Sequence, residues 1–103
     1  MSLNFYITAI KTSVYSGNYT HNVIPMWELA GIYDDLYNSE GKKCKDIITN
    51  LKKGLDIMLR NPDKFRKLNP PNGWGDYDSA VKFLKEIINN CEKYPDGEIE
   101  ISK

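Results

Sequence analysis

Two short segments gather the side chains that are best suited to hold a ligand. Residues 15–22 read YSGNYTHN, and residues 69–77 read NPPNGWGDY. Their aromatic rings offer stacking surfaces, and their amides and hydroxyls offer uncharged hydrogen-bond donors and acceptors. A nucleobase or another flat polar ring uses both, because stacking on Trp or Tyr contributes about 1–3 kcal/mol. The candidate ligand-binding set is therefore Tyr15, Asn18, Thr20, His21, Asn22, Asn72, Trp74 and Asp76.

Each segment by itself also has an ordinary structural explanation. Asn, Ser, Thr and Gly are common in turns and helix caps. A Trp in a loop of Pro and Gly often fills a gap in the core, and His21 has an alternative role as the partner of a backbone carbonyl. What favours a binding site is that two polar–aromatic segments each precede an expected helix.

Catalysis and metal binding have little support. His21 is the only histidine, and the only two cysteines, Cys44 and Cys91, lie far apart in the chain. A structural zinc site takes four such ligands, so we expect no metal and no cofactor. No P-loop, dinucleotide fingerprint or zinc-protease motif is present, and no acid stands beside Ser16 and His21 for a hydrolytic triad.

Length and charge limit the remaining classes of function. A chain of 103 residues is enough for one domain, which we place over residues 1–103. Acidic and basic residues balance at 14 each, whereas duplex-binding proteins usually carry a basic surplus, so duplex nucleic acid is not an expected partner. The chain has neither the ~18 consecutive apolar residues of a membrane span nor a signal-peptide pattern at its start. We therefore expect a cytoplasmic protein with no membrane partner.

The first half of the chain predicts a strand, a loop and a helix. Residues 3–14 alternate with apolar and β-branched side chains and predict a strand. Both of its faces have apolar character, which suggests a strand that is covered on both sides or paired across a subunit interface. Residues 15–22 break that alternation and read as a loop. Pro25 belongs in the first turn of the next helix, with its cap at or near Asn22, and Gly31 is expected to end that helix.

The second half predicts two amphipathic helices. Residues 42–60 carry apolar side chains at helical spacing, with lysines opposite. Residues 69–76 form a rigid turning loop, and Asp76 or Asp78 caps a helix whose apolar stripe ends at Cys91. Residues 98–101 alternate as a final strand.

These elements predict an α+β fold. The N- and C-terminal strands pair in a small antiparallel sheet that is packed against three to four helices. Because a two-stranded sheet is marginal by itself, we also expect a homodimer that shares a larger sheet.

The same residues resemble a family of small phage and prophage proteins of similar length. The family pattern is Y-S-x-N-x-T-H-N, then A-G-I-Y, then N-P-x-N-G-W-G-D-Y, followed by an amphipathic helix and a short strand. Residues 15–22, 30–33 and 69–77 match it, so the resemblance covers nearly the whole chain, and Pro25 departs from the pattern. The family is largely uncharacterised, and the resemblance implies a setting rather than an activity.

In that setting the residues favour a binding protein. Small phage proteins often counteract host defence, so the leading hypothesis is a sponge that sequesters a small nucleotide-derived immune signal in the host bacterial cytosol, without catalysis. A helix N-terminus beside residues 15–22 and the basic stretch 42–67 would suit its phosphate. The main alternative is direct inhibition of a host defence protein, such as a CRISPR nuclease. A second alternative is a nucleotide-degrading enzyme that uses His21.

Overall fold

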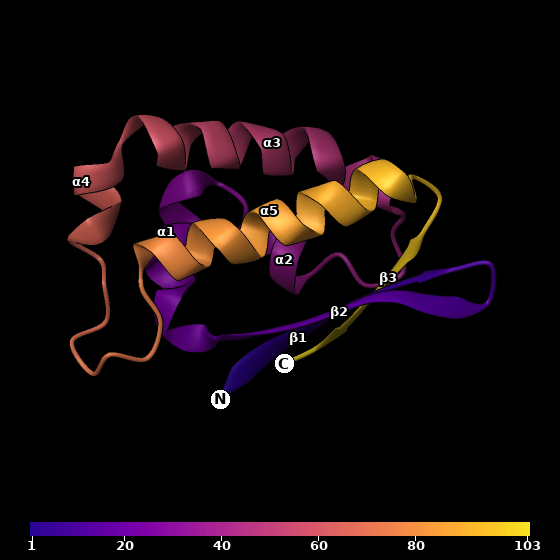
Figure 1. Cartoon of the computed structure of the whole chain (residues 1–103), viewed down its shortest axis with the longest axis horizontal. Coiled ribbons are helices and arrows are strands. Elements are labelled where there is room, and N and C mark those ends of the chain that lie inside the picture. Colours follow the sequence, from indigo (N-terminus) through magenta and orange to yellow (C-terminus); the bar gives the residue numbers. More distant parts are fainter.

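The computed structural model describes all 103 residues and confirms the predicted α+β fold. Figure 1 shows the helices gathered on one side of a small sheet. In chain order the elements are β1 (Ser2–Ala9), β2 (Thr12–Thr20), the 3₁₀ turn η1 (His21–Val23), α1 (Ile24–Ala30), α2 (Tyr33–Tyr37), α3 (Cys44–Arg60), α4 (Pro62–Arg66), α5 (Tyr77–Lys93) and β3 (Glu98–Ser102).

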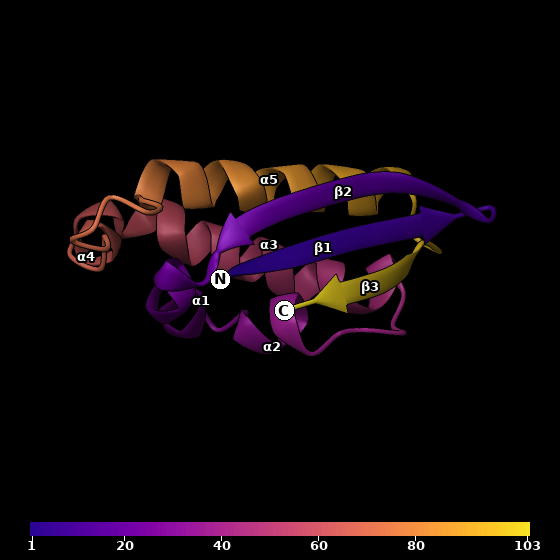
Figure 2. The ribbon, with the colours of Figure 1, turned by 90° about the horizontal axis from the view of Figure 1, so that it is seen from below.

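The sheet has three antiparallel strands in the order β2-β1-β3. Figure 2 shows β1 between the other two, so the predicted pairing of the first and last strands is confirmed. Phe5 marks the register, because it lies opposite Gly17 on β2 and opposite Ile101 on β3.

The strand that the sequence did not predict is β2. Residues 3–14 are not one strand, because the chain reverses at Ile10 and Lys11, which both have positive φ (52° and 61°). Residues 15–20 are therefore not a loop but the second half of β2. Tight two-residue turns with this backbone usually contain Asn or Gly, and neither is present here.

The core lies between the sheet and the helices. Leu3, Phe5 and Ile7 of β1 are fully buried on the helix side, while the intervening side chains lie on the open face. The predicted stripe of α5 is buried from Ala80 to Cys91. α3 and α5 pack against each other above the sheet (Figure 1). None of the helices combines the length and the apolar character needed to cross a membrane.

Local signals set several helix ends. Gly31 ends α1 with φ 76°, as predicted, and Asp76 caps α5. The cap of α1 was predicted at or near Asn22, and the capping position is the next residue, Val23, where no side chain makes a capping hydrogen bond. Within α3, Gly54 is needed for close packing, since a Cβ there would collide with the Ile32 side chain.

Candidate ligand-binding cleft

The two polar–aromatic segments meet around one cleft, at the point where the end of β2 faces the loop of residues 69–76. The cleft measures about 640 Å³, which is the size of a pocket for a small ligand. Five of the eight predicted residues line it: Asn18, Thr20, Asn22, Asn72 and Trp74.

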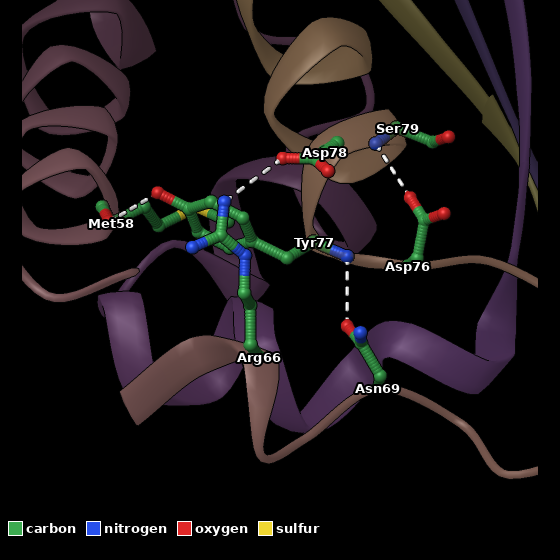
Figure 3. A network of polar contacts seen from close by, with 7 residues as sticks. All are labelled: Met58, Arg66, Asn69, Asp76, Tyr77, Asp78 and Ser79. Carbon is green, nitrogen blue, oxygen red and sulfur yellow. Dashed lines mark hydrogen bonds and ion pairs between the residues drawn. The ribbon is translucent and has the colours of Figure 1, made fainter. Parts of the chain in front are cut away.

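Side-chain and backbone contacts hold the 69–76 loop in a fixed shape. Asn69 Oδ1 accepts a hydrogen bond from the backbone N–H of Tyr77 (2.9 Å), which ties the start of the loop to its end. Figure 3 shows this contact and a second one at the other end of Tyr77, where the hydroxyl donates to the Met58 carbonyl (2.7 Å). The Arg66 guanidinium lies over the Tyr77 ring, 4.9 Å from its centre. The loop is thus anchored at its base to both α3 and α4.

Tyr19 and Gly75 join the loop to β2. The Tyr19 hydroxyl donates to the carbonyl of Asp76 (3.1 Å) and accepts from its N–H (3.2 Å). Burial raises the pKa of Tyr19, so the hydroxyl stays protonated and can serve in both bonds. The Tyr19 ring stacks on Phe83, with ring centres 5.2 Å apart. A Cβ on Gly75 would lie 2.6 Å from Thr20 Cγ2, so only glycine permits this contact.

Trp74 stands at the cleft with 70% of its surface exposed. The other tryptophan, Trp27, is fully buried in the core. The structural explanation that Trp74 fills a gap in the core is therefore wrong. Its backbone N–H donates to Asn72 Oδ1 (3.0 Å), which fixes the turn that presents the indole. The indole itself is exposed and free to stack on a ligand.

The other three predicted residues lie outside the cleft and have structural contacts. The Tyr15 hydroxyl donates to Glu86 of α5 (3.3 Å). Asp76 Oδ1 accepts from the backbone N–H of Ser79 (2.8 Å) and caps α5 (Figure 3). These contacts explain both residues without a ligand.

His21 also has a structural partner. Its Nδ1 lies 2.8 Å from the Tyr37 hydroxyl, with which it shares a hydrogen bond. Burial, with a smaller contribution from the N-terminal amine, lowers the pKa of His21 and favours its neutral form. His21 is not among the residues that line the cleft.

Sequence reasoning missed four residues that also line the cleft: Met1, Ser2, Tyr19 and Gly75. Ser2 belongs there because it lies opposite Thr20 across the hairpin. Asn18 Nδ2 donates to Ser2 Oγ (2.9 Å) and to Asn4 Oδ1 (2.8 Å). Ser2 could have been predicted from the register of the hairpin, which places it opposite Thr20. That register can be worked out only once the turn at Ile10–Lys11 is recognised.

No charged side chain lines the cleft. The basic stretch 42–67 is therefore not part of it, and the expectation that this stretch complements a phosphate there has no support. The α1 helix has only seven residues, and the first turn of α5 is already capped by Asp76. The side chains that line the cleft are instead uncharged, and they comprise amides, hydroxyls, aromatic rings and Met1.

Elsewhere the structure contains no group of three or more His, Cys, Asp or Glu side chains arranged to hold a metal ion. No family model, no curated protein and no solved structure matches the chain.

Proposed function

We propose that the protein is a non-enzymatic binding module that holds a small ligand by a flat, uncharged polar ring. The leading ligand is the base of a nucleotide-derived signal. The observation that carries this proposal is the meeting of the exposed Trp74 indole with uncharged polar side chains from both segments in one cleft. Stacking on an indole and hydrogen bonding to amides are the two interactions that a nucleobase makes best.

The free polar atoms of the cleft support a base as the bound group. Asn18 uses its Nδ2 within the hairpin and leaves Oδ1 as an acceptor. Asn72 uses its Oδ1 for the Trp74 N–H and leaves Nδ2 as a donor. The Asn22 side chain makes no hydrogen bond within the protein and offers both. Donors and acceptors within one cleft match the edge of a base, which also presents both.

The biological role that we propose follows from the resemblance to phage and prophage proteins. The module would sequester a nucleotide-derived immune signal in the host bacterial cytosol. The lining side chains carry no positive charge, so we propose that they contact the base rather than the phosphates of that signal. We do not propose a nucleotide-degrading enzyme, since His21 bonds to Tyr37 and lies outside the cleft.

One observation favours a second candidate function, the direct inhibition of a host defence protein. A tryptophan that is 70% exposed on an anchored loop is the kind of side chain that dominates the binding energy of protein interfaces. In that case Trp74 would insert into a pocket on the defence protein, and no small ligand would be needed.

Calorimetric titration and thermal unfolding with nucleosides, nucleotides and cyclic nucleotides test the proposal. We expect at least one to bind, and its nucleoside to retain most of the affinity because the base is the part held. Trp74→Ala should weaken binding by about 5- to 150-fold, which corresponds to a lost stacking contact. Leu59→Ala is the matched control, since Leu59 is 49% exposed on α3, outside the cleft.

Three outcomes would redirect the interpretation. If no compound binds, the small-ligand proposal is wrong and direct inhibition becomes the leading function. Binding that is equally strong in Trp74→Ala would remove the stacking argument. A ligand that is released from the heat-denatured protein in altered form would indicate an enzyme.

A further inference from the structure

The two edge strands of the sheet, β3 and β2, differ in whether their outward backbone groups have hydrogen-bond partners. The β3 edge is covered by the segment before α3: Ile99 accepts from the N–H of Gly41 and donates to the carbonyl of Lys42, both at 2.9 Å. The N–H of Ile101 donates to Glu40 Oε1 (3.1 Å). Three of the outward backbone groups of β3 are therefore already bonded, which leaves little for another strand to pair with on this side.

The β2 edge, on the opposite side of the sheet, has no such cover (Figure 2). Apart from their bonds to β1, the backbone groups of Thr12–Asn18 make no hydrogen bond to any other backbone group. The 69–76 loop reaches this edge at its end, where Gly75 lies against Thr20.

The hairpin register shows which groups point outward. In an antiparallel pair, successive residues direct their N–H and C=O alternately toward the partner strand and away from it. The His21 N–H donates to the Met1 carbonyl, which fixes the phase of this alternation. Gly17 and Tyr19 therefore bond to β1, while Ser16 and Asn18 direct their N–H and C=O away from the sheet.

Natural edge strands are protected from pairing by charged side chains, Pro, short length or a β-bulge. β2 has an irregularity at Val14, where the register with β1 shifts, but its stretch from Tyr15 to Thr20 is regular. β2 has nine residues, TSVYSGNYT, none of which is charged or Pro. Nothing in this strand repels another uncharged strand.

We propose that β2 pairs with β2 of a second copy of this chain, antiparallel across a two-fold axis. Such a contact requires a surface that is complementary to itself. Ser16 and Asn18 each supply one outward donor and one outward acceptor, and the uncharged strand meets its own copy without electrostatic repulsion. The two sheets then form one continuous six-stranded sheet, which is a common size, whereas three strands are few.

Hydrogen exchange and sedimentation equilibrium test this pairing without any ligand, so the result does not depend on the proposed function. We expect a species of twice the mass of the chain at high protein concentration. The amides of Ser16 and Asn18 should become protected as concentration rises, because they gain partners only in the dimer. The amides of Gly17 and Tyr19 should be protected at every concentration, because they bond to β1.

A pair of variants locates the interface. Ser16→Lys places a charge at the free edge and should raise the dissociation constant of the dimer by about tenfold or more. Ser102→Lys makes the same change on the exposed face of β3 and should leave that constant unchanged. Both side chains are exposed on the open face, so the circular dichroism spectrum should be that of the original chain.

The proposal is overturned by a monomer at all concentrations, or by a dimer that both lysine variants affect equally. A dimer in which the Ser16 and Asn18 amides stay unprotected would place the interface elsewhere. The proposal is also overturned if these amides become protected only when an extended peptide of another protein is added, because another chain would then pair with β2.

Discussion

The junction between the 69–76 loop and β2 can be tested with two glycines of the same loop. Gly73 and Gly75 both have positive φ, 78° and 95°. A Cβ on Gly73 would meet nothing within 4 Å, whereas a Cβ on Gly75 would lie 2.6 Å from Thr20 Cγ2 and 3.0 Å from Val23 Cγ1. Gly73→Ala therefore tests backbone strain alone, and Gly75→Ala tests strain together with a collision.

The magnitudes of the two effects follow from these contacts. An alanine with positive φ costs about 1–2 kcal/mol in either variant. In Gly75→Ala the loop must also move away from β2, which breaks the two hydrogen bonds between the Tyr19 hydroxyl and the Asp76 backbone. At about 1 kcal/mol each, their loss makes Gly75→Ala about 2 kcal/mol less stable than Gly73→Ala.

Urea denaturation followed by far-ultraviolet circular dichroism measures this difference. About 2 kcal/mol corresponds to a melting temperature lower by roughly 8–16 °C in a domain of this size. Gly75→Ala should also lose ligand affinity, because the cleft opens, while Gly73→Ala should keep it. Equal destabilisation of the two variants would refute the claim that Gly75 positions the loop on β2.

Two further predictions concern His21 and Asp76. Burial keeps the pKa of His21 in the folded protein below the ordinary 6.5 that applies in the unfolded chain. Between these two pKa values the unfolded chain binds more protons than the folded protein, so the free energy of unfolding falls as the pH drops through this range. Urea titrations at about pH 7 and about pH 5.5 should show this loss, and His21→Gln should show less of it. Asp76→Ala should lower stability by about 1 kcal/mol through the lost α5 cap, whereas Asp76→Asn should nearly restore it in thermal denaturation.

The helices were predictable because their signals are local. Asp76 precedes an apolar stripe at helical spacing, and Gly31 supplies the left-handed residue that ends α1. The hairpin was not predictable because its turn, Ile10–Lys11, contains a β-branched residue where Asn or Gly is usual. The pairing of β1 with β2, which flank the turn, holds this unfavourable backbone, and that pairing is not visible in a local sequence pattern.

The sequence predicted the types of residue that line the candidate site, but it did not predict which individual residues of those types line it. Asn18, Thr20 and Trp74 are in the cleft, while Tyr15 and His21 have the same chemical character and lie outside it. The difference is set by distant partners, since Tyr15 bonds to Glu86 and His21 to Tyr37. A strand also alternates its side chains between two faces, so reading residues 15–20 as a loop concealed which of them point together.

The central position of β1 has a consequence for the order in which the protein can fold during synthesis. β1 is made first, but its partner β3 is Glu98–Ser102, so the sheet is incomplete until those residues have left the ribosome. Until α5 is made, the apolar side chains of Leu3, Phe5 and Ile7 lack most of the core that covers them. Contacts between such distant segments slow folding and leave apolar surface open to aggregation. The newly made hairpin is therefore the segment that a chaperone would protect first.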